Sequence, residues 1–187
     1  MKIKNPLALR IVLALVVLSF MTVLVLLGSR SVLKSLYPVK YTEFVETYAN
    51  ENNLSTDFVY AVIKCESGFQ SDAVSSVGAK GLMQIMPDTF DWIHGRLRDD
   101  ASYSDIFDPE LNIKYGCHLY GYLLQKYESE EVAVAAYHAG LGNVDKWLKN
   151  EEYSSDGKTL SDIPFSSTEQ YVRKVIETKK NYQKLYK

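Results

Sequence analysis

The chain has 187 residues, the length of one domain with or without an appendage. Hydrophobic residues make up 47% and charged residues 24%, a balance that is typical of a globular protein and excludes a disordered chain. With 21 basic and 23 acidic residues the formal net charge is −2, so charge gives no reason to expect a nucleic acid as partner.

Charged and aromatic residues are distributed unevenly along the chain. Residues 1–36 contain five basic residues and no acidic residue, so they carry +5 and residues 37–187 must carry −7 to give the total of −2. All 14 tyrosines lie in the second part. The average composition therefore conceals two unlike segments, which are best considered separately.

The first segment is strongly apolar. Residues 11–27 are apolar except for Ser19 and Thr22. As a helix these 17 residues extend roughly 26 Å, slightly less than a hydrocarbon core of ~30 Å, and residues 7–9 add length if Arg10 directs its guanidinium to the headgroups. The sequence predicts a single N-terminal transmembrane helix, with residues 1–30 as cytoplasmic tip and anchor and 31–40 as a linker broken at Pro38.

A cleaved secretory signal is the alternative for this segment, with Lys2 and Lys4 as its charged start. The apolar run is longer than the usual ~7–15 residues, and residues 28–31 offer no small-x-small cleavage site. Basic residues are slightly more numerous before the span than after it. The positive-inside bias then predicts a cytoplasmic N-terminus and places residues 37–187 outside the membrane, facing the cell wall.

The second segment, residues 41–187, has helical periodicity and helix-end signals throughout. Helices are predicted over 42–51, from a cap at Ser55 to about residue 66, and from Pro87 to about residue 97, with a loop over 70–80. The Asp108-Pro109 pair predicts a helix over 110–127, and a further helix is predicted from Ser129 to a stop at Gly140. A short helix over 142–150 and a loop over 151–163 follow. The last predicted helix begins at a capping box over 167–170 and runs to the C-terminus. No long β-type alternation occurs, so the predicted fold class is all-α.

Several catalytic motifs are absent from the sequence. The three histidines lack zinc-ligand spacing, and there is no HExxH motif, Walker A loop, GxSxG elbow or GxGxxG motif after a strand. We therefore expect no metal site and no cofactor.

Glu66 stands out among the acidic residues. It follows the apolar stretch 59–63 and falls in the last predicted turn of its helix, before Ser67-Gly68. The negative end of the helix dipole and partial burial both favour the protonated carboxyl, so we expect a raised pKa. A carboxyl that is neutral near pH 6–7 suits general acid catalysis, although most glutamates that end a helix are simply exposed.

Four sequence motifs then carry a family resemblance. They are Cys-Glu-Ser-Gly-Phe at 65–69 with residues 73–76, Gly-Ala-Lys-Gly-Leu-Met-Gln-Ile-Met-Pro at 78–87, Ala-Tyr-His-Ala-Gly at 136–140 and Thr-Glu-Gln-Tyr-Val at 168–172. In this order they resemble the lytic transglycosylases of the soluble-lytic-transglycosylase (SLT) type, over residues 41–187. The resemblance implies a lysozyme-like helical domain that cleaves the β-1,4 bond between N-acetylmuramic acid and N-acetylglucosamine in peptidoglycan and leaves a 1,6-anhydro end.

The resemblance also implies roles for residues of these motifs. Glu66 matches the family's single catalytic glutamate, which acts first as acid and then as base. The expected substrate-binding residues are Ser67, Gly81, Met83, Gln84, Tyr137, His138, Gly140 and Tyr171. Among them, Tyr171 is expected to contact Glu66 or the nearby acetamido group, and Met83 to line the cleft. The third motif commonly has asparagine where this chain has His138.

Some alternatives remain open at this stage. A muramidase that hydrolyses the same bond and a non-catalytic wall-binding module both suit the same fold. Cys65 and Cys117 either form a disulfide outside the cytoplasm or remain two small buried residues. The sequence gives no indication of the oligomeric state.

Overall fold

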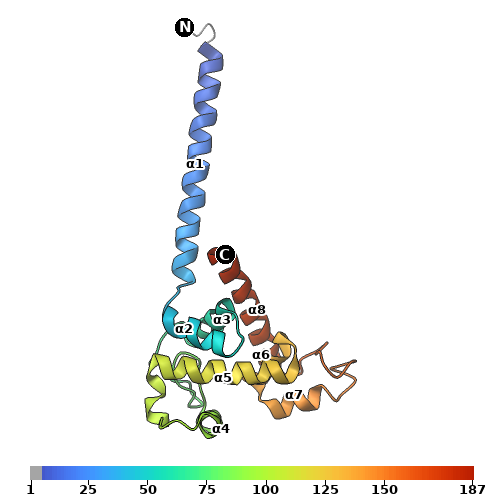
Figure 1. The fold of residues 1–187 in the computed structure, drawn as a ribbon. Helices are drawn as coiled ribbons and strands as arrows, with labels where there is room; N and C mark the ends of the chain where they lie inside the picture. The colour runs from blue at the N-terminus through green and yellow to red at the C-terminus, as the bar shows by residue number, and fades with distance from the viewer. Residues whose placement is uncertain (1–5) are drawn as a thin grey trace. The chain divides into compact units, whose positions relative to one another are not determined.

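The computed structural model describes residues 6–187, except for the side chains of residues 6–8, 11, 25–27 and 29. The chain divides into two compact units, one ending at Pro38 and one running from Val39 to Lys187. Figure 1 shows one long helix in the first unit and helices joined by loops in the second, and the elements of the described part contain no β-strand. The predicted all-α class is therefore confirmed.

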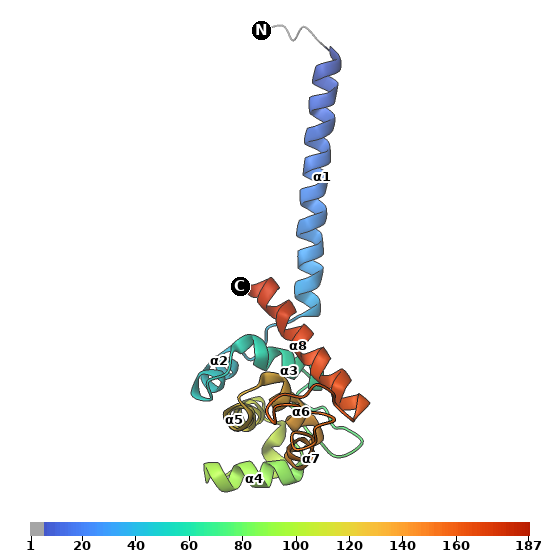
Figure 2. The same ribbon diagram turned by 90° about the vertical axis from the view of Figure 1, so that its right-hand side faces the viewer.

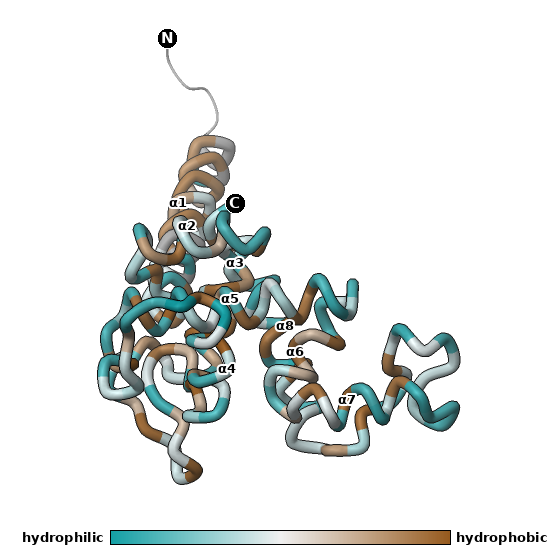
Figure 3. Tube along the Cα trace, turned by 60° about the horizontal axis from the view of Figure 1, so that its bottom comes forward, coloured by the Kyte–Doolittle hydropathy of each residue, from teal (hydrophilic) through white to brown (hydrophobic). Residues whose placement is uncertain are grey.

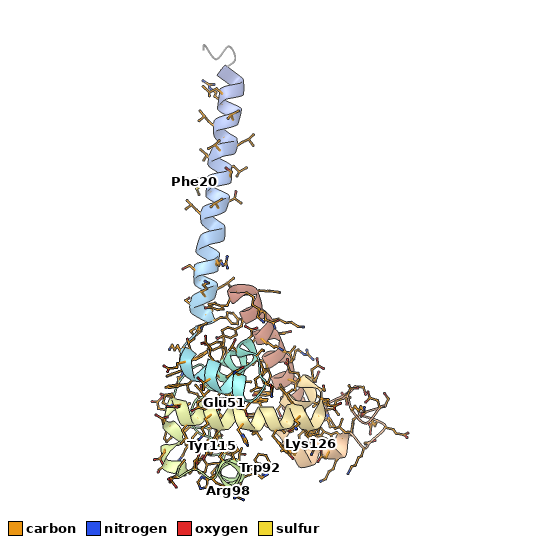
Figure 4. All side chains as sticks on the ribbon, viewed as in Figure 1. Phe20, Glu51, Trp92, Arg98, Tyr115 and Lys126 are labelled. Carbon is orange, nitrogen blue, oxygen red and sulfur yellow. The ribbon has the colours of Figure 1, made fainter. Side chains whose placement is uncertain are left out.

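The first unit is a single helix, α1 (Pro6–Leu36). The hydropathy colouring of Figure 3 is brown along most of it, and Figure 4 shows side chains such as Phe20 projecting from its surface. Leu18 is 65% and Phe20 62% exposed. Among the residues that the structure describes, no helix combines the length and apolarity needed to cross a membrane. Lys2 and Lys4, and side chains at both ends of the predicted span, lie outside the described set.

The predicted linker over residues 31–40 is partly helical, because α1 continues to Leu36. The helix ends just before Pro38, where the missing N–H and the restricted preceding residue disfavour further helix. The boundary therefore follows the proline, while the residues before it have no reason to leave the helix.

The first two helices of the second unit follow the predictions closely. Helix α2 (Thr42–Glu51) has the expected bounds, and α3 (Thr56–Glu66) begins after Ser55, whose Oγ accepts a hydrogen bond from the amide of Phe58 at 3.3 Å. Seven consecutive residues of α3, Asp57 to Ile63, are buried. Helix α3 is thus the central helix of this unit.

The remaining helices complete the core of this unit, and among them α8 makes the most extensive contact with α3. They are α4 (Pro87–Leu97), η1 (Tyr103–Phe107), α5 (Pro109–Tyr127), α6 (Glu130–Ala139), α7 (Leu141–Trp147) and α8 (Ser166–Tyr186). Figures 1 and 2 show α8 beside α3, with α6 packed between α5 and α8. Residues 70–80 form a loop with isolated bridges only, Val74 with Lys80 and Lys80 with Ile85.

Three local predictions differ from the structure. The short helix η1 was not expected, because its five residues are too few to show helical periodicity. Helix α7 is one residue earlier at its start and ends at Trp147. The capping box predicted at 167–170 is not formed, since α8 begins after Phe165 with no side-chain cap, and the Glu169 carboxylate instead accepts a hydrogen bond from Arg173 at 2.6 Å.

Candidate active site

Glu66 lies at the C-terminal end of α3, half-buried between helices of the second unit. Burial raises the pKa of its carboxyl from 4.5 to about 7, although the Tyr171 hydroxyl and the Lys174 ammonium both oppose the rise. The prediction of a raised pKa is confirmed, with desolvation as the main cause. Near neutral pH this carboxyl is therefore divided between its protonated and ionised forms.

Tyr171 is the hydrogen-bonding partner of this carboxyl. Its hydroxyl donates to Glu66 Oε1 at 2.5 Å, and the residue is only 9% exposed. Because Oε1 accepts this hydrogen bond, Oε2 is the oxygen left to carry and transfer a proton. Tyr171 belongs to the first turns of α8, so the packing of α8 on α3 creates the pair. The contact expected between these two residues is present.

A row of tyrosines continues from this pair into the core. The Tyr120 hydroxyl lies 3.3 Å from that of Tyr171, and the Tyr120 ring stacks on Tyr137 at a centroid distance of 4.2 Å. The Tyr137 hydroxyl donates to the carbonyl oxygen of Met83 at 2.5 Å. Burial raises the pKa of all three phenols well above 10. These hydroxyls are therefore neutral donors at any physiological pH.

The loop that follows α3 is fixed by two polar side chains. Ser67 Oγ donates to the carbonyl of Leu82 at 2.8 Å and accepts from the amide of Phe69 at 3.2 Å, so it ties the helix end to the loop. Asn112 of α5 is fully buried and accepts from the amide of Met83 at 2.7 Å. Its Nδ2 donates to the carbonyls of Lys80 and Ile106 at 3.0 and 2.8 Å. Ser67 was expected to hydrogen-bond the carboxyl or the substrate, but its Oγ instead contacts backbone groups of the loop and, at 3.2 Å, the carbonyl of Ile63 in α3.

Gly81 and Met83 pack the same loop against α5. Gly81 is buried with a φ of 77°, and a Cβ there would lie 2.1 Å from Asn112 Nδ2. Met83 is 0% exposed, and its sulfur would lie 2.2 Å from a Cβ on Gly116 of α5. Both residues pack against α5. The expectations that Gly81 lets the backbone approach a sugar and that Met83 lines the cleft stay predictions.

Gln84 also contributes to the loop. Its Nε2 donates to the carbonyls of Gly81 and Ala73 at 2.9 and 3.2 Å, in a residue with a φ of 51°. The amide donors expected to bind an acetamido group are thus engaged with the backbone, while Gln84 remains half-buried at the surface of the loop.

His138 and Gly140 occupy the end of α6. The His138 ring stacks on Tyr171 at 4.6 Å, and its Nδ1 lies 2.9 Å from Oγ1 of Thr168. Burial lowers the pKa of this imidazole, although the residue is still partly exposed. Gly140, with a φ of 85°, ends the helix as predicted. His138 is therefore linked to Glu66 through one intervening ring.

A small cavity adjoins the third motif. It has a volume of about 230 Å³ and is lined by residues of α4 to α7, including Trp92, Tyr137 and Gly140. Figure 4 labels Trp92 on α4. The cavity combines aromatic rings with the polar side chains of Asp88 and Thr89. Among the described residues no group of three or more His, Cys, Asp or Glu could hold a metal ion.

The two cysteines remain thiols. Cys65 Sγ donates to Thr178 Oγ1 at 3.6 Å, while Cys117 is fully buried in α5. The disulfide considered for this pair is not formed, because Cys65 faces α8 and not α5. The alternative, two small buried residues, is confirmed for Cys117, whereas Cys65 is only half-buried.

Sequence reasoning missed Tyr120, Asn112 and Thr168 as parts of the site. Tyr120 is one of 14 tyrosines and has no motif around it. Asn112 did give a signal, because a polar residue on an otherwise apolar helix face must find hydrogen-bonding partners when buried.

Comparisons with known proteins agree with this geometry. Residues 43–160 match the family described as Transglycosylase SLT domain. A soluble lytic murein transglycosylase of Salmonella typhimurium is 32% identical over 148 residues, which are 77% of this chain and 23% of that protein. A membrane-bound lytic murein transglycosylase C of Edwardsiella ictaluri is 27% identical over 169 residues, 78% of this chain and 47% of that protein.

A solved structure extends the similarity to the fold. The inactive glutamate-to-glutamine mutant of the lytic transglycosylase Slt from Pseudomonas aeruginosa aligns with a TM-score of 0.71 and 33% identity, over 82% of this chain and 25% of that one. The chain thus spans about a quarter to a half of the length of these relatives. Because the family match covers more than half of the chain, this protein belongs to the Transglycosylase SLT domain family.

Proposed function

We propose that this protein is a lytic transglycosylase that cleaves the bond between N-acetylmuramic acid and N-acetylglucosamine in peptidoglycan and leaves 1,6-anhydro ends. The observation that carries the proposal is the Glu66–Tyr171 pair, in which a half-buried carboxyl has a pKa of about 7. The soluble and membrane-bound relatives named as murein transglycosylases support the same activity. The inactive mutant of the Pseudomonas enzyme, in which a glutamate is exchanged for glutamine, supports a catalytic role for a glutamate.

The proposed mechanism uses Glu66 twice. The protonated carboxyl gives its proton from Oε2 to the glycosidic oxygen, and the bond from that oxygen to the muramoyl C1 breaks. The resulting carboxylate then takes the proton of the muramoyl C6 hydroxyl, whose oxygen closes the anhydro ring on C1. The proton balance is zero, so the carboxyl returns to its starting state without water. Tyr171 holds Oε1 and stabilises the intermediate carboxylate.

Roles for the other predicted residues follow from their place around Glu66. Tyr137 and Gly140, which line the neighbouring cavity, are proposed to contact the sugar, as is His138 at the partly exposed end of α6. Ser67, Gly81, Met83 and Gln84 are proposed to act indirectly, by holding the loop that faces Glu66.

We also propose that α1 anchors the chain in the cell membrane as a single span, with the N-terminus in the cytoplasm and the catalytic unit facing the cell wall. The exposure of large apolar side chains around α1 and the lack of acidic residues before Tyr37 support this proposal. The stretch over residues 11–27 includes side chains outside the described set, so the described helix represents it only in part. Membrane fractionation of the full chain and of a chain starting at residue 37 tests it: the anchor is refuted if both remain in the soluble fraction.

Mass spectrometry of released muropeptides tests the activity. The full chain is expected to release products with 1,6-anhydro ends, which are one water lighter than hydrolysis products. Glu66→Gln should reduce release by at least ~10²-fold, the usual share of general acid–base catalysis, whereas the exposed Glu177→Gln should match wild type. Products with reducing ends would indicate a muramidase, and no release by any of the three proteins would indicate a non-catalytic wall-binding module.

A further inference from the structure

A second cavity lies at the other end of α3 from Glu66. It has a volume of about 250 Å³ and is lined by residues from the starts of α2 and α3 and the end of α8, among them Glu46, Asp57 and Tyr60. Asp57 and Glu66 are nine positions apart on α3, which separates them by ~13 Å along the helix axis. This cavity is therefore distinct from the candidate active site.

Asp57 places a buried carboxylate in this cavity. The residue is only 6% exposed, so its carboxylate is largely shielded from water. The ammonium of Lys187 forms an ion pair with Asp57 Oδ2 at 2.5 Å. A buried carboxylate requires such a countercharge, because the interior solvates an isolated charge poorly. The Lys187 side chain is 63% exposed, so its ammonium reaches the Asp57 carboxylate from the open side of the cavity.

Tyr60 adds an unsatisfied polar atom. Its hydroxyl is buried without a hydrogen-bonding partner among the described residues, and the residue is 6% exposed. Burial raises the pKa of this phenol, and the Thr42 side chain, which lines the same cavity, opposes the rise. An unpaired buried hydroxyl is energetically unfavourable, so a ligand that donates a hydrogen bond to this oxygen would bind favourably.

Aromatic rings and a second carboxylate surround these two groups. Tyr182 stacks on Tyr60 at 5.6 Å and on Tyr186 at 6.0 Å, and both of these neighbours line the cavity with it. Glu46 contributes a further negative charge. Ring faces attract cations, and the combination of a carboxylate, an oxygen acceptor and rings suits a group with several N–H donors and a positive charge.

We propose that this cavity binds a primary ammonium at the end of an unbranched aliphatic chain, as on a lysine-type residue of a peptide. The ammonium of Lys187 occupies part of the site and shows which chemistry the carboxylate accepts. A divalent cation fits less well, since no group of three His, Cys, Asp or Glu in the described part could hold one. The site goes beyond the proposed glycan cleavage and does not depend on it.

Ligand-observed NMR on the full chain tests the site, with Nα-acetyl-lysine amide as probe and the Nα,Nε-diacetyl compound, which lacks the charge, as control. Lys187→Met removes the internal competitor and keeps an aliphatic stem, so the Kd for the lysine probe should fall about tenfold. Lys184→Met, at an exposed lysine in the last turn of α8, should leave the Kd at the wild-type value. Equal binding of both probes to the Lys187→Met variant would overturn the proposal.

Two further variants probe the groups that bind the ammonium. Asp57→Asn in the Lys187→Met background should raise the Kd at least tenfold, with circular dichroism as the check of folding. Tyr60→Phe removes a hydroxyl that has no hydrogen-bonding partner among the described residues, so it should raise the Kd several-fold without lowering the melting temperature. If Tyr60→Phe leaves the Kd unchanged while Asp57→Asn also has no effect, the cavity is not an ammonium site.

Discussion

The hydroxyl of Tyr171 donates a hydrogen bond to Glu66 Oε1 across 105 positions of sequence. The bond stabilises the ionised carboxylate, and burial of the same carboxyl stabilises the protonated form. Burial is the larger effect, so the pKa lies at about 7 and both forms are available near neutral pH. This balance suits a group that first gives and then takes a proton.

Tyr171→Phe should shift the pH dependence of catalysis. The substitution removes a hydrogen bond that lowers the pKa of Glu66, so the pKa rises and the fall of kcat/KM on the alkaline side moves to higher pH. Because the variant no longer stabilises the intermediate carboxylate, kcat should fall roughly tenfold or more. A pH–rate profile of peptidoglycan cleavage measures both effects, and an alkaline limb at the wild-type position would contradict the role of the hydroxyl.

The raised pKa of Glu66 also predicts a pH-dependent stability. Between pH 4.5 and about 7 the folded chain holds this proton more tightly than the unfolded chain does. The contribution of Glu66 to the free energy of unfolding is therefore complete below pH 4.5 and is lost as the pH rises to about 7. Glu66→Gln removes this loss and should raise the free energy of unfolding at pH 8 by up to about 3 kcal/mol. Urea denaturation at pH 5 and pH 8 measures it. Glu177→Gln, at an exposed site, keeps Glu66 and should therefore lose as much stability between pH 5 and pH 8 as the wild type does.

Titration of His138 should add an acidic limb to the pH dependence of activity. Burial lowers the pKa of its imidazole, so it becomes charged only below its ordinary range near 6.5. An imidazolium stacked on Tyr171 would favour the ionised form of Glu66 and reduce the fraction that can donate a proton. Activity should therefore decline on the acidic side in wild type, and His138→Asn should remove this decline. His118→Asn, at the α5 position lining another cavity, serves as control, and an acidic limb that survives His138→Asn would refute the titration.

Gly81→Ala should destabilise the chain severely. A Cβ at this position would lie 2.1 Å from Asn112 Nδ2, and the φ of 77° disfavours any L side chain. We expect a loss of about 3 kcal/mol or more in the free energy of unfolding. Gly142→Ala provides the matched control, because a Cβ there meets no atom within 4 Å and α7 favours alanine. Thermal melting compares the two, and equal melting temperatures would show that the loop accommodates the Cβ.

The cysteines should both react as thiols. Under non-reducing conditions, mass mapping of the unfolded chain should find two alkylated cysteines and no bridge. In the folded chain Cys117 should be protected, because it is fully buried and burial raises its pKa strongly. Cys65 is half-buried and should react slowly. Detection of a Cys65–Cys117 bridged peptide would show that the two sulfurs come together in the folded chain.

The sequence by itself determined most of the helices, because their ends are set by local chemistry. Ser55, Asp108 and Ser129 each accept a hydrogen bond from an amide of the following turn, as predicted. The sequence also indicated the raised pKa of Glu66, because this residue follows an apolar stretch and lies in the last turn of its helix. The prediction of a capping box near residue 167 was wrong. The Glu169 carboxylate accepts a hydrogen bond from Arg173, one turn further along the helix.

Only the tertiary structure decided what most motif residues do. Gly81, Met83 and Gln84 stand in a motif that resembles a substrate-binding segment, yet their contacts are with Asn112, Gly116 and the loop backbone. Tyr120 and Tyr171 meet because α5 and α8 pack around the end of α3. A sequence motif records which residue types stand together along the chain. The direction of each side chain depends on long-range packing, which local spacing does not encode.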